Sequence, residues 1–174
     1  MKTFCIIIFI SVFGFTMFAQ KTSTSGQFSK PTIQVGVVVS DLNEAFDFYT
    51  EVIGMSQTGA FTVSGEKAKE LGLSDGRELD VKILKLEDSP QATEWKLMSF
   101  GKDAAHPKQK YIHDDTGMQY ITIFVKDINA SMERIKKHNI KILSGRPSEL
   151  GGGNYFLLIQ DPDGTFIELI GPKL

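Results

Sequence analysis

The stretch that decides the fold runs from Gln34 to Met55 and reads QVGVVVSDLNEAFDFYTEVIGM. Its first part, Gln34 to Val39, is rich in β-branched residues, which favour a strand. Asp41 then predicts a helix N-cap, and Glu44, three residues later, completes a capping-box pattern. Apolar residues recur at helical spacing as far as Gly54, the residue type expected just after a helix. The stretch therefore predicts a strand, a sharp turn and an amphipathic helix.

A second copy of this unit lies in the C-terminal half of the chain. Tyr120 to Val125 is again rich in strand formers, and Asp127 is again the expected N-cap. Ile128, Met132 and Ile135 follow it as a helical stripe. Repetition of one supersecondary unit predicts two related modules in one chain.

Further strand patterns follow each copy, so each module is predicted to have the order β-α-β-β-β within an α+β fold. Module one, residues 32–101, adds predicted strands at 56–63, 78–86 and 94–100 and a short inserted helix at 66–71. Module two, residues 118–171, is predicted to contain a strand at 119–125, a helix at 128–138, a short strand at 140–143, a glycine-rich loop at 145–153, and strands at 154–160 and 165–170. The polar residues 102–117 are predicted to link the two modules.

The N-terminal segment, residues 1–19, has the pattern of a secretory signal peptide. Lys2 is followed by an apolar run from Cys5 to Phe18, and Ala19 is a suitable small residue before a cleavage point. The alternative is an uncleaved anchor, but the run is shorter than the ~20 residues of a membrane span. Residues 20–31 are predicted to be a flexible leader. We expect an exported protein, periplasmic or secreted in a bacterium, with no membrane association after cleavage.

Composition excludes several classes of function. The chain has 174 residues and a formal net charge of −2, without the basic stripe that nucleic-acid binding requires. Its only cysteine, Cys5, leaves with the signal peptide, so disulfides, thiolate metal sites and a cysteine nucleophile are not expected. Neither a Ser-His-Asp set nor a nucleotide-binding fingerprint is present.

Several short motifs together resemble the vicinal oxygen chelate superfamily, which includes glyoxalase I, extradiol dioxygenases, fosfomycin-resistance proteins and bleomycin-binding proteins. The matching residues are Val39-Ser40-Asp41-Leu42, Phe48-Tyr49, Gly54-Met55, Val125-Lys126-Asp127-Ile128 and Asp161-Pro162-Asp163-Gly164-Thr165-Phe166-Ile167-Glu168-Leu169. The resemblance covers residues 32–171. It implies that the two modules form a cup-shaped, open-barrel mixed sheet with a ligand site inside.

The alternation of strand residues then predicts which side chains face this cup. Under the resemblance, the cup-facing residues that would bind a small molecule are Gln34, Lys96, Met98, Tyr120, Phe124 and Phe166, with Glu168 as the candidate catalytic carboxylate. The resemblance leaves open whether the modules pair within one chain or between the chains of a homodimer.

In metal-using members, four cup-facing positions bind a divalent ion such as Zn, Ni, Mn or Fe. Gln34 and Glu168 match two of these positions. Tyr120 stands where a His is usual, and Lys96 stands where a Glu or a His is usual. A protonated lysine repels a cation. The ligand set is therefore incomplete. Glu168 is interpreted either as a metal ligand and general base or as the ion-pair partner of Lys96.

Two functions are consistent with these residues. The first is an exported glyoxalase-like lyase or dioxygenase that uses a divalent metal at Gln34 and Glu168. The second is a metal-free module of the bleomycin-resistance type, which binds a small, partly apolar molecule in the same cup.

Overall fold

The computed structural model describes residues 26, 28–101 and 107–174. The predicted signal peptide at 1–19 lies outside the described residues, as do most of the predicted leader and residues 102–106 of the predicted linker. In the part of the chain that the structure describes, no helix is long and apolar enough to cross a membrane.

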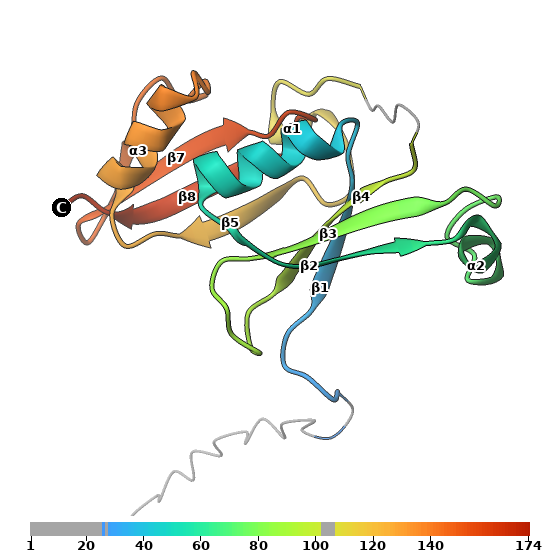
Figure 1. Ribbon diagram of the computed structural model, residues 1–174. Helices are drawn as coiled ribbons and strands as arrows, with labels where there is room; N and C mark the ends of the chain where they lie inside the picture. Colours follow the sequence, from blue (N-terminus) through green and yellow to red (C-terminus); the bar gives the residue numbers. More distant parts are fainter. Residues whose placement is uncertain (1–25, 27, 102–106) are drawn as a thin grey trace, which may run out of the picture.

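Module one forms a four-stranded sheet, here called sheet A (Figure 1). Its strands are β1 Gln34–Val38, β2 Ser56–Val63, β3 Leu79–Lys85 and β4 Glu94–Ser99, in the spatial order β1-β4-β3-β2. β1 and β4 are parallel, and the other neighbours are antiparallel. The predicted inserted helix is confirmed as α2, Gly65–Glu70, between β2 and β3.

The helix after β1 has two parts. Asp41 caps α1, Leu42–Asp47, by accepting from the backbone N–H groups of Asn43 and Glu44. The chain then continues as the π-helix η1, Phe48–Ile53, where the sequence predicts a regular α-helix. In a π-helix, with its i→i+5 hydrogen bonds, residues that are four or five positions apart lie on the same face. Phe48, Tyr49, Val52 and Ile53 share such a face in η1 and are all buried. Gly54 ends the helix with a φ of 92°, as predicted from its position.

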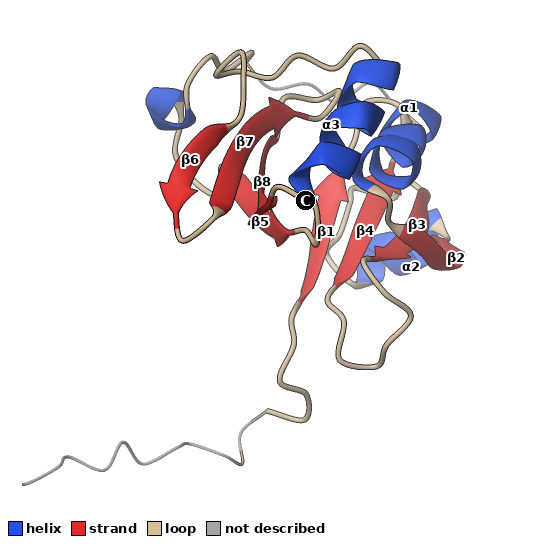
Figure 2. Cartoon of the chain, turned by 90° about the vertical axis from the view of Figure 1, so that its left-hand side faces the viewer, coloured by secondary structure: helices blue, strands red, loops and turns tan. Residues whose placement is uncertain are grey.

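Module two repeats this arrangement in sheet B. Its elements are β5 Tyr120–Phe124, α3 Ile128–Lys137, β6 Ser148–Gly151, β7 Asn154–Gln160 and β8 Phe166–Pro172, with a short 3₁₀ helix, η2 Ile112–Asp114, before them. The spatial order is β5-β8-β7-β6, with β5 and β8 parallel. Figure 2 shows the two sheets lying beside each other as separate sheets.

The prediction of a strand at 140–143 is wrong, and so is the prediction of a loop throughout 145–153. Leu143 donates one backbone bond to Leu158, but a turn from Ile142 to Gly145 stops further pairing. The strand forms instead at β6, where Ser148 and Glu149 pair with Phe156 and Tyr155. Short apolar runs do not reveal which of two neighbouring segments will find a partner strand.

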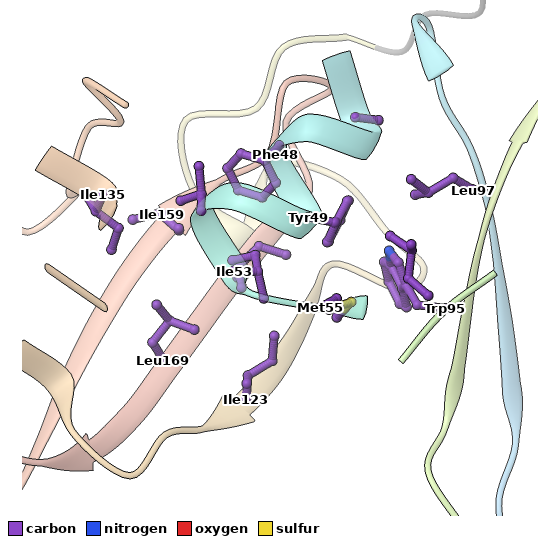
Figure 3. Close-up of a cluster of buried hydrophobic side chains, with 14 of the residues drawn as sticks. Phe48, Tyr49, Ile53, Met55, Trp95, Leu97, Ile123, Ile135, Ile159 and Leu169 are labelled. Atoms are coloured by element: carbon purple, nitrogen blue, oxygen red, sulfur yellow. The ribbon is translucent and has the colours of Figure 1, made fainter. Parts of the chain in front are cut away.

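A single core joins the two modules, because η1 lies between the sheets (Figure 3). On one side of η1 lie Trp95 and Leu97 of sheet A, and on the other lie Ile123, Ile159 and Leu169 of sheet B. The side chains that alternate with the predicted cup-facing residues therefore pack against the helices, and the predicted alternation of the two strand faces is confirmed. So is the α+β fold of two βαβββ modules, whose sheets do not close into one barrel.

Hydrogen bonds between the modules fix this packing. The Tyr49 hydroxyl donates to Asp161 Oδ2 at 2.8 Å, and the Ser40 backbone N–H donates to the Asp163 carboxylate. Arg134 of α3 donates to the carbonyl oxygens of Val52 and Ile53 at the end of η1. Because α1, η1 and α3 lie in this core, the opposite face of each sheet is left on the outside, apart from the part of sheet A that α2 covers at Leu79 and Val81. We call these the open faces.

Candidate functional site

The open face of sheet A carries a polar group of side chains around Gln34. The Gln34 Nε2 donates to Glu94 Oε2 at 2.6 Å, and its Oε1 accepts from Lys96 Nζ at 2.6 Å. Gln34 lies opposite Glu94 in the parallel register of β1 and β4, and Lys96 follows two residues along the same face. The amide thus has a carboxylate on one side and an ammonium on the other.

A second lysine completes this group. Lys85 Nζ on β3 lies 3.7 Å from Glu94 Oε1, and Lys96 Nζ lies 3.9 Å from Glu94 Oε2. The three charged side chains are 14% (Lys85), 22% (Glu94) and 24% (Lys96) exposed, so water screens them only in part. We name Gln34, Lys85, Glu94 and Lys96 the Gln34 cluster. Its formal charge is positive, since two ammonium groups flank one carboxylate.

A cavity of about 460 Å³ opens beside the Gln34 cluster. Gln34 and Glu94 form part of its wall, and the rest comes from the segment before β1 and the loop before β4, including Phe28, Thr32 and Pro90. This volume lies within the range of small-molecule sites. The cluster therefore borders a space that a small ligand could enter.

The open face of sheet B carries the other predicted residues. Glu168 on β8 lies opposite Thr122 on β5, and its Oε2 accepts from the Thr122 hydroxyl at 2.6 Å. Tyr120 and Phe124 lie on the same face of β5 as Thr122, and their side chains are 46% and 78% exposed. This face therefore presents one carboxylate and two accessible aromatic rings.

Two of the predicted ligand-binding side chains serve packing within this chain. Met98 packs with Val81 and Leu79 in a small cluster beneath Ala68 of α2. It also lies over Gly36, where a Cβ would stand 2.9 Å from the Met98 methyl group. Phe166 is buried, and its side chain contributes to the wall of a cavity on the open face of sheet B. Neither is accessible to a ligand in the way that Tyr120 and Phe124 are.

Lys96 and Glu168 do not meet within one chain. Lys96 contacts Gln34 and Glu94 on sheet A, whereas Glu168 contacts Thr122 on sheet B. The sheets share a core through their helix-bearing faces, so these two side chains lie on separate outer surfaces. The predicted ion pair between them is therefore absent from the single chain.

The sequence patterns do not single out Glu94 or Lys85 as site residues. Glu94 has the same strand parity as Lys96, but only the register of β1 against β4 places it beside Gln34. Lys85 reaches the cluster because β3 pairs with β4 in the antiparallel register that puts Ile83 opposite Lys96. Parity can be read from one strand, whereas register requires two.

The side chains around Gln34 do not fit a divalent cation. The single amide oxygen that would bind a metal accepts a hydrogen bond from the Lys96 ammonium. A cation at this oxygen would lie against a positive charge, and water screens that repulsion incompletely. Across residues 28–101 and 107–174, no group of three or more His, Cys, Asp or Glu side chains could hold a metal ion.

This geometry agrees with the comparison to known protein families. A model of the Glyoxalase/Bleomycin resistance protein/Dioxygenase superfamily matches residues 32–169, which include both βαβββ modules. The chain belongs to this superfamily. The resemblance inferred from the short sequence motifs is thereby confirmed.

Individual members of the superfamily are similar over most of the chain. An uncharacterized protein of Bacillus subtilis, YwbC, is 28% identical over 76% of this chain and 90% of its own length. A probable lactoylglutathione lyase of Vibrio cholerae is 29% identical over 78% of this chain and 86% of its own length. Among solved structures, a glyoxalase family protein from Bacillus cereus aligns with a TM-score of 0.70 at 20% identity, covering 87% of this chain and 99% of its own. The structural similarity shows the fold alone.

Proposed function

We propose that this superfamily member binds a small molecule without a metal ion, in a cup built from the open faces of two copies of the chain. The contact between Lys96 and Gln34 carries the proposal, because it puts an ammonium group where metal-using relatives need a ligand. The protein would then resemble the bleomycin-resistance type of the superfamily rather than its metal-dependent enzymes.

The exposed side chains of the open faces support a homodimer. Val38 on sheet A is 45% exposed, and Tyr120 and Phe124 on sheet B are 46% and 78% exposed. Clustered apolar side chains on the face of a sheet are typical of surfaces that another protein covers. A two-fold dimer would set sheet A of each chain against sheet B of its partner. The Gln34 cluster and Glu168 would then face one cup.

The polar groups of this cup suggest how it would recognise its ligand. Lys96 and Lys85 would donate to carbonyl or carboxylate oxygens, and Glu168 would accept from a hydroxyl or amine. Val38 and Phe124 would pack on apolar parts of the molecule. The ligand class is therefore a small, partly apolar molecule with at least one oxygen acceptor.

A metal-dependent lyase is the second candidate, and the names of two relatives favour it. The Vibrio cholerae relative is a probable lactoylglutathione lyase, and an Arabidopsis thaliana lactoylglutathione lyase, GLX1, is 24% identical over 76% of this chain. A Zn, Ni, Mn or Fe ion would then be held by Gln34 and Glu168. For this candidate, Lys96 must release Gln34.

Metal content and ligand binding together decide between the two candidates. The protein is purified without chelator and dialysed in turn against Zn, Ni, Mn and Fe(II), and its metal content is measured. We expect no stoichiometric ion. One ion per chain that is lost in Glu168→Gln would overturn the metal-free proposal.

A thermal-shift screen of small oxygen-containing ligands provides the second measurement. The ligands that raise the unfolding temperature are titrated against Lys96→Ala, and Lys126→Ala removes the same charge from an exposed position as a control. We expect Lys96→Ala to weaken binding by about tenfold, since a charged hydrogen bond contributes roughly 1.5–3 kcal/mol. Equal affinity in both variants would remove Lys96 from the site.

We also propose that the protein is exported, because residues 1–19 have the pattern of a signal peptide. The test is N-terminal sequencing of the protein recovered from the periplasm or medium of a bacterial host. A new N-terminus at Gln20 or close to it is expected. Recovery of the intact chain from the cytoplasm alone would contradict export.

A further inference from the structure

A second cavity, also of about 460 Å³, lies on the open face of sheet B away from the Gln34 cluster. Its apolar lining includes Phe156 and Leu158 of β7, whose side chains are half-buried, and Phe166 of β8, which is buried. Leu143 and Ile112 form apolar walls on two sides. All the residues that line the cavity come from one chain, so its existence does not depend on the dimer proposed above.

Hydrogen bonds hold the two walls in place. The Leu143 backbone N–H donates to the Leu158 carbonyl at 2.8 Å, which fixes one wall along β7. Gln160 Nε2 donates to the Gln109 carbonyl at 3.1 Å, which fixes the other. Asp114 Oδ2 accepts from the backbone N–H groups of Lys110 and Tyr111 and shapes that wall into a turn. A ligand would therefore enter a largely preformed site.

The rim of this cavity is cationic. Lys110 and Lys141 both contribute to its lining, and none of the lining residues is acidic. The nearby Asp114 is outside the lining; its Oδ2 accepts from backbone N–H groups, and its Oδ1 lies 3.7 Å from Nε2 of His113, which lines the cavity. Two lysines in a lining that is otherwise largely apolar favour a ligand with an anionic end and an apolar body.

The entrance also offers a flat aromatic surface. The rings of Tyr111 and His113 stack with their centroids 5.4 Å apart and their planes 4° apart. Lys110 Nζ lies 5.1 Å from the centroid of the Tyr111 ring. Stacked rings beside a cation favour a planar, aromatic ligand over a flexible chain.

We propose that this cavity binds an amphipathic organic anion, namely an aromatic molecule that carries a carboxylate or sulfonate. The aromatic body lies on Phe156 and Leu158, and the anionic group accepts from Lys110 and Lys141. The cavity lies on the face that forms half of the proposed cup, since Leu158 is the strand partner of Glu168. It uses none of the side chains of the Gln34 cluster, so it is a separate subsite whose ligand can fail to bind without affecting the test of Lys96.

The test uses two fluorescent probes that share an aromatic body and differ in charge. Anilinonaphthalene sulfonate carries a sulfonate, and phenylnaphthylamine is uncharged. Each is titrated into the full-length folded protein. We expect saturable binding of the sulfonate, and we expect the double variant Lys110→Gln/Lys141→Gln to weaken it by about tenfold. The same double variant should change the affinity of the uncharged probe by less than about twofold, because the contacts of that probe are apolar.

A matched double variant, Lys69→Gln/Lys126→Gln, removes the same charge at positions that do not line the cavity. It should bind the sulfonate as the unmodified protein does. The proposal is overturned if the unmodified protein shows no saturable binding, if Lys110→Gln/Lys141→Gln keeps full affinity, or if both double variants lose affinity equally. All four substituted lysines are exposed, so an unfolding temperature close to that of the unmodified protein is expected for each variant.

Discussion

At the scale of single residues, the contact between Tyr49 and Asp161 has the clearest physical consequence. Asp161 is only 5% exposed, and burial raises the pKa of its carboxyl above the ordinary value of 3.8, although bonds from Tyr49 and Thr165 partly offset the rise. Burial beside this carboxylate likewise raises the pKa of the Tyr49 hydroxyl. The two modules are thus joined through a carboxyl group that is more easily protonated in the folded state than in the unfolded chain.

This pKa shift predicts a dependence of stability on pH. The folded protein binds a proton at Asp161 more tightly than the unfolded chain does, so protonation of Asp161 stabilises the fold. This stabilisation is full below the ordinary pKa of 3.8 and is lost as pH rises through the raised pKa of the folded protein. Asp161→Asn keeps an oxygen for the N–H groups of Asp163 and Thr165 but cannot ionise. We expect urea unfolding to show that the variant gains stability relative to the unmodified protein as pH rises. A difference that stays constant from acid to neutral pH would contradict the raised pKa.

At the scale of elements, most boundaries could be predicted because local patterns determine them. The strand at 56–63 and the N-caps Asp41 and Asp127 are as the sequence indicates. The π-helical geometry of η1 could not be predicted, since it depends on the burial of one helix face between two sheets. Likewise, Gln34, Lys96 and Glu168 could be predicted as cup-facing residues on the side of the sheet away from α1 and α3, but the role of Glu94 depends on the pairing of β1 with β4.

The helix α2 provides a prediction at this scale. Its first residue, Gly65, packs against the loop that leads into β3, where an added Cβ would lie 2.1 Å from the Gly76 carbonyl oxygen. Because that oxygen belongs to the backbone, Gly65→Ala must shift α2 and should lower the free energy of unfolding by about 1–3 kcal/mol. Chemical denaturation measures this change. Gly59→Ala is the control, since its Cβ would meet Ile83 at an ordinary 3.4 Å; an equal loss in both variants would contradict the assigned contact.

At the scale of the whole molecule, the sheets of one chain use their helix-bearing faces to make the core and leave their open faces outside. The sequence motifs predicted the modules and left open whether the modules pair within a chain or between chains. Choosing between these arrangements requires knowing where α1 and η1 pack. No residue pattern within a single module contains that information.

The proposed dimer gives the prediction at this scale. Phe124→Asp places a charge on the most exposed aromatic of β5, where the partner chain would cover it, and should shift the protein from dimer to monomer. Light scattering after gel filtration measures the mass. Leu86→Asp, at a 53% exposed leucine just beyond β3, should leave the dimer intact. An unmodified protein that is monomeric at all concentrations would exclude the two-chain cup.

The position of β8 has a consequence for the order of events during synthesis. β8 follows the other described strands in the sequence, yet it lies inside sheet B, where β5 and β7 both pair with it. Sheet B therefore cannot assemble until Phe166–Pro172 has left the ribosome. Until then, the side of η1 that packs on Ile159 and Leu169 has no cover. A nascent chain halted before β8 should thus keep an apolar helix face open to chaperones.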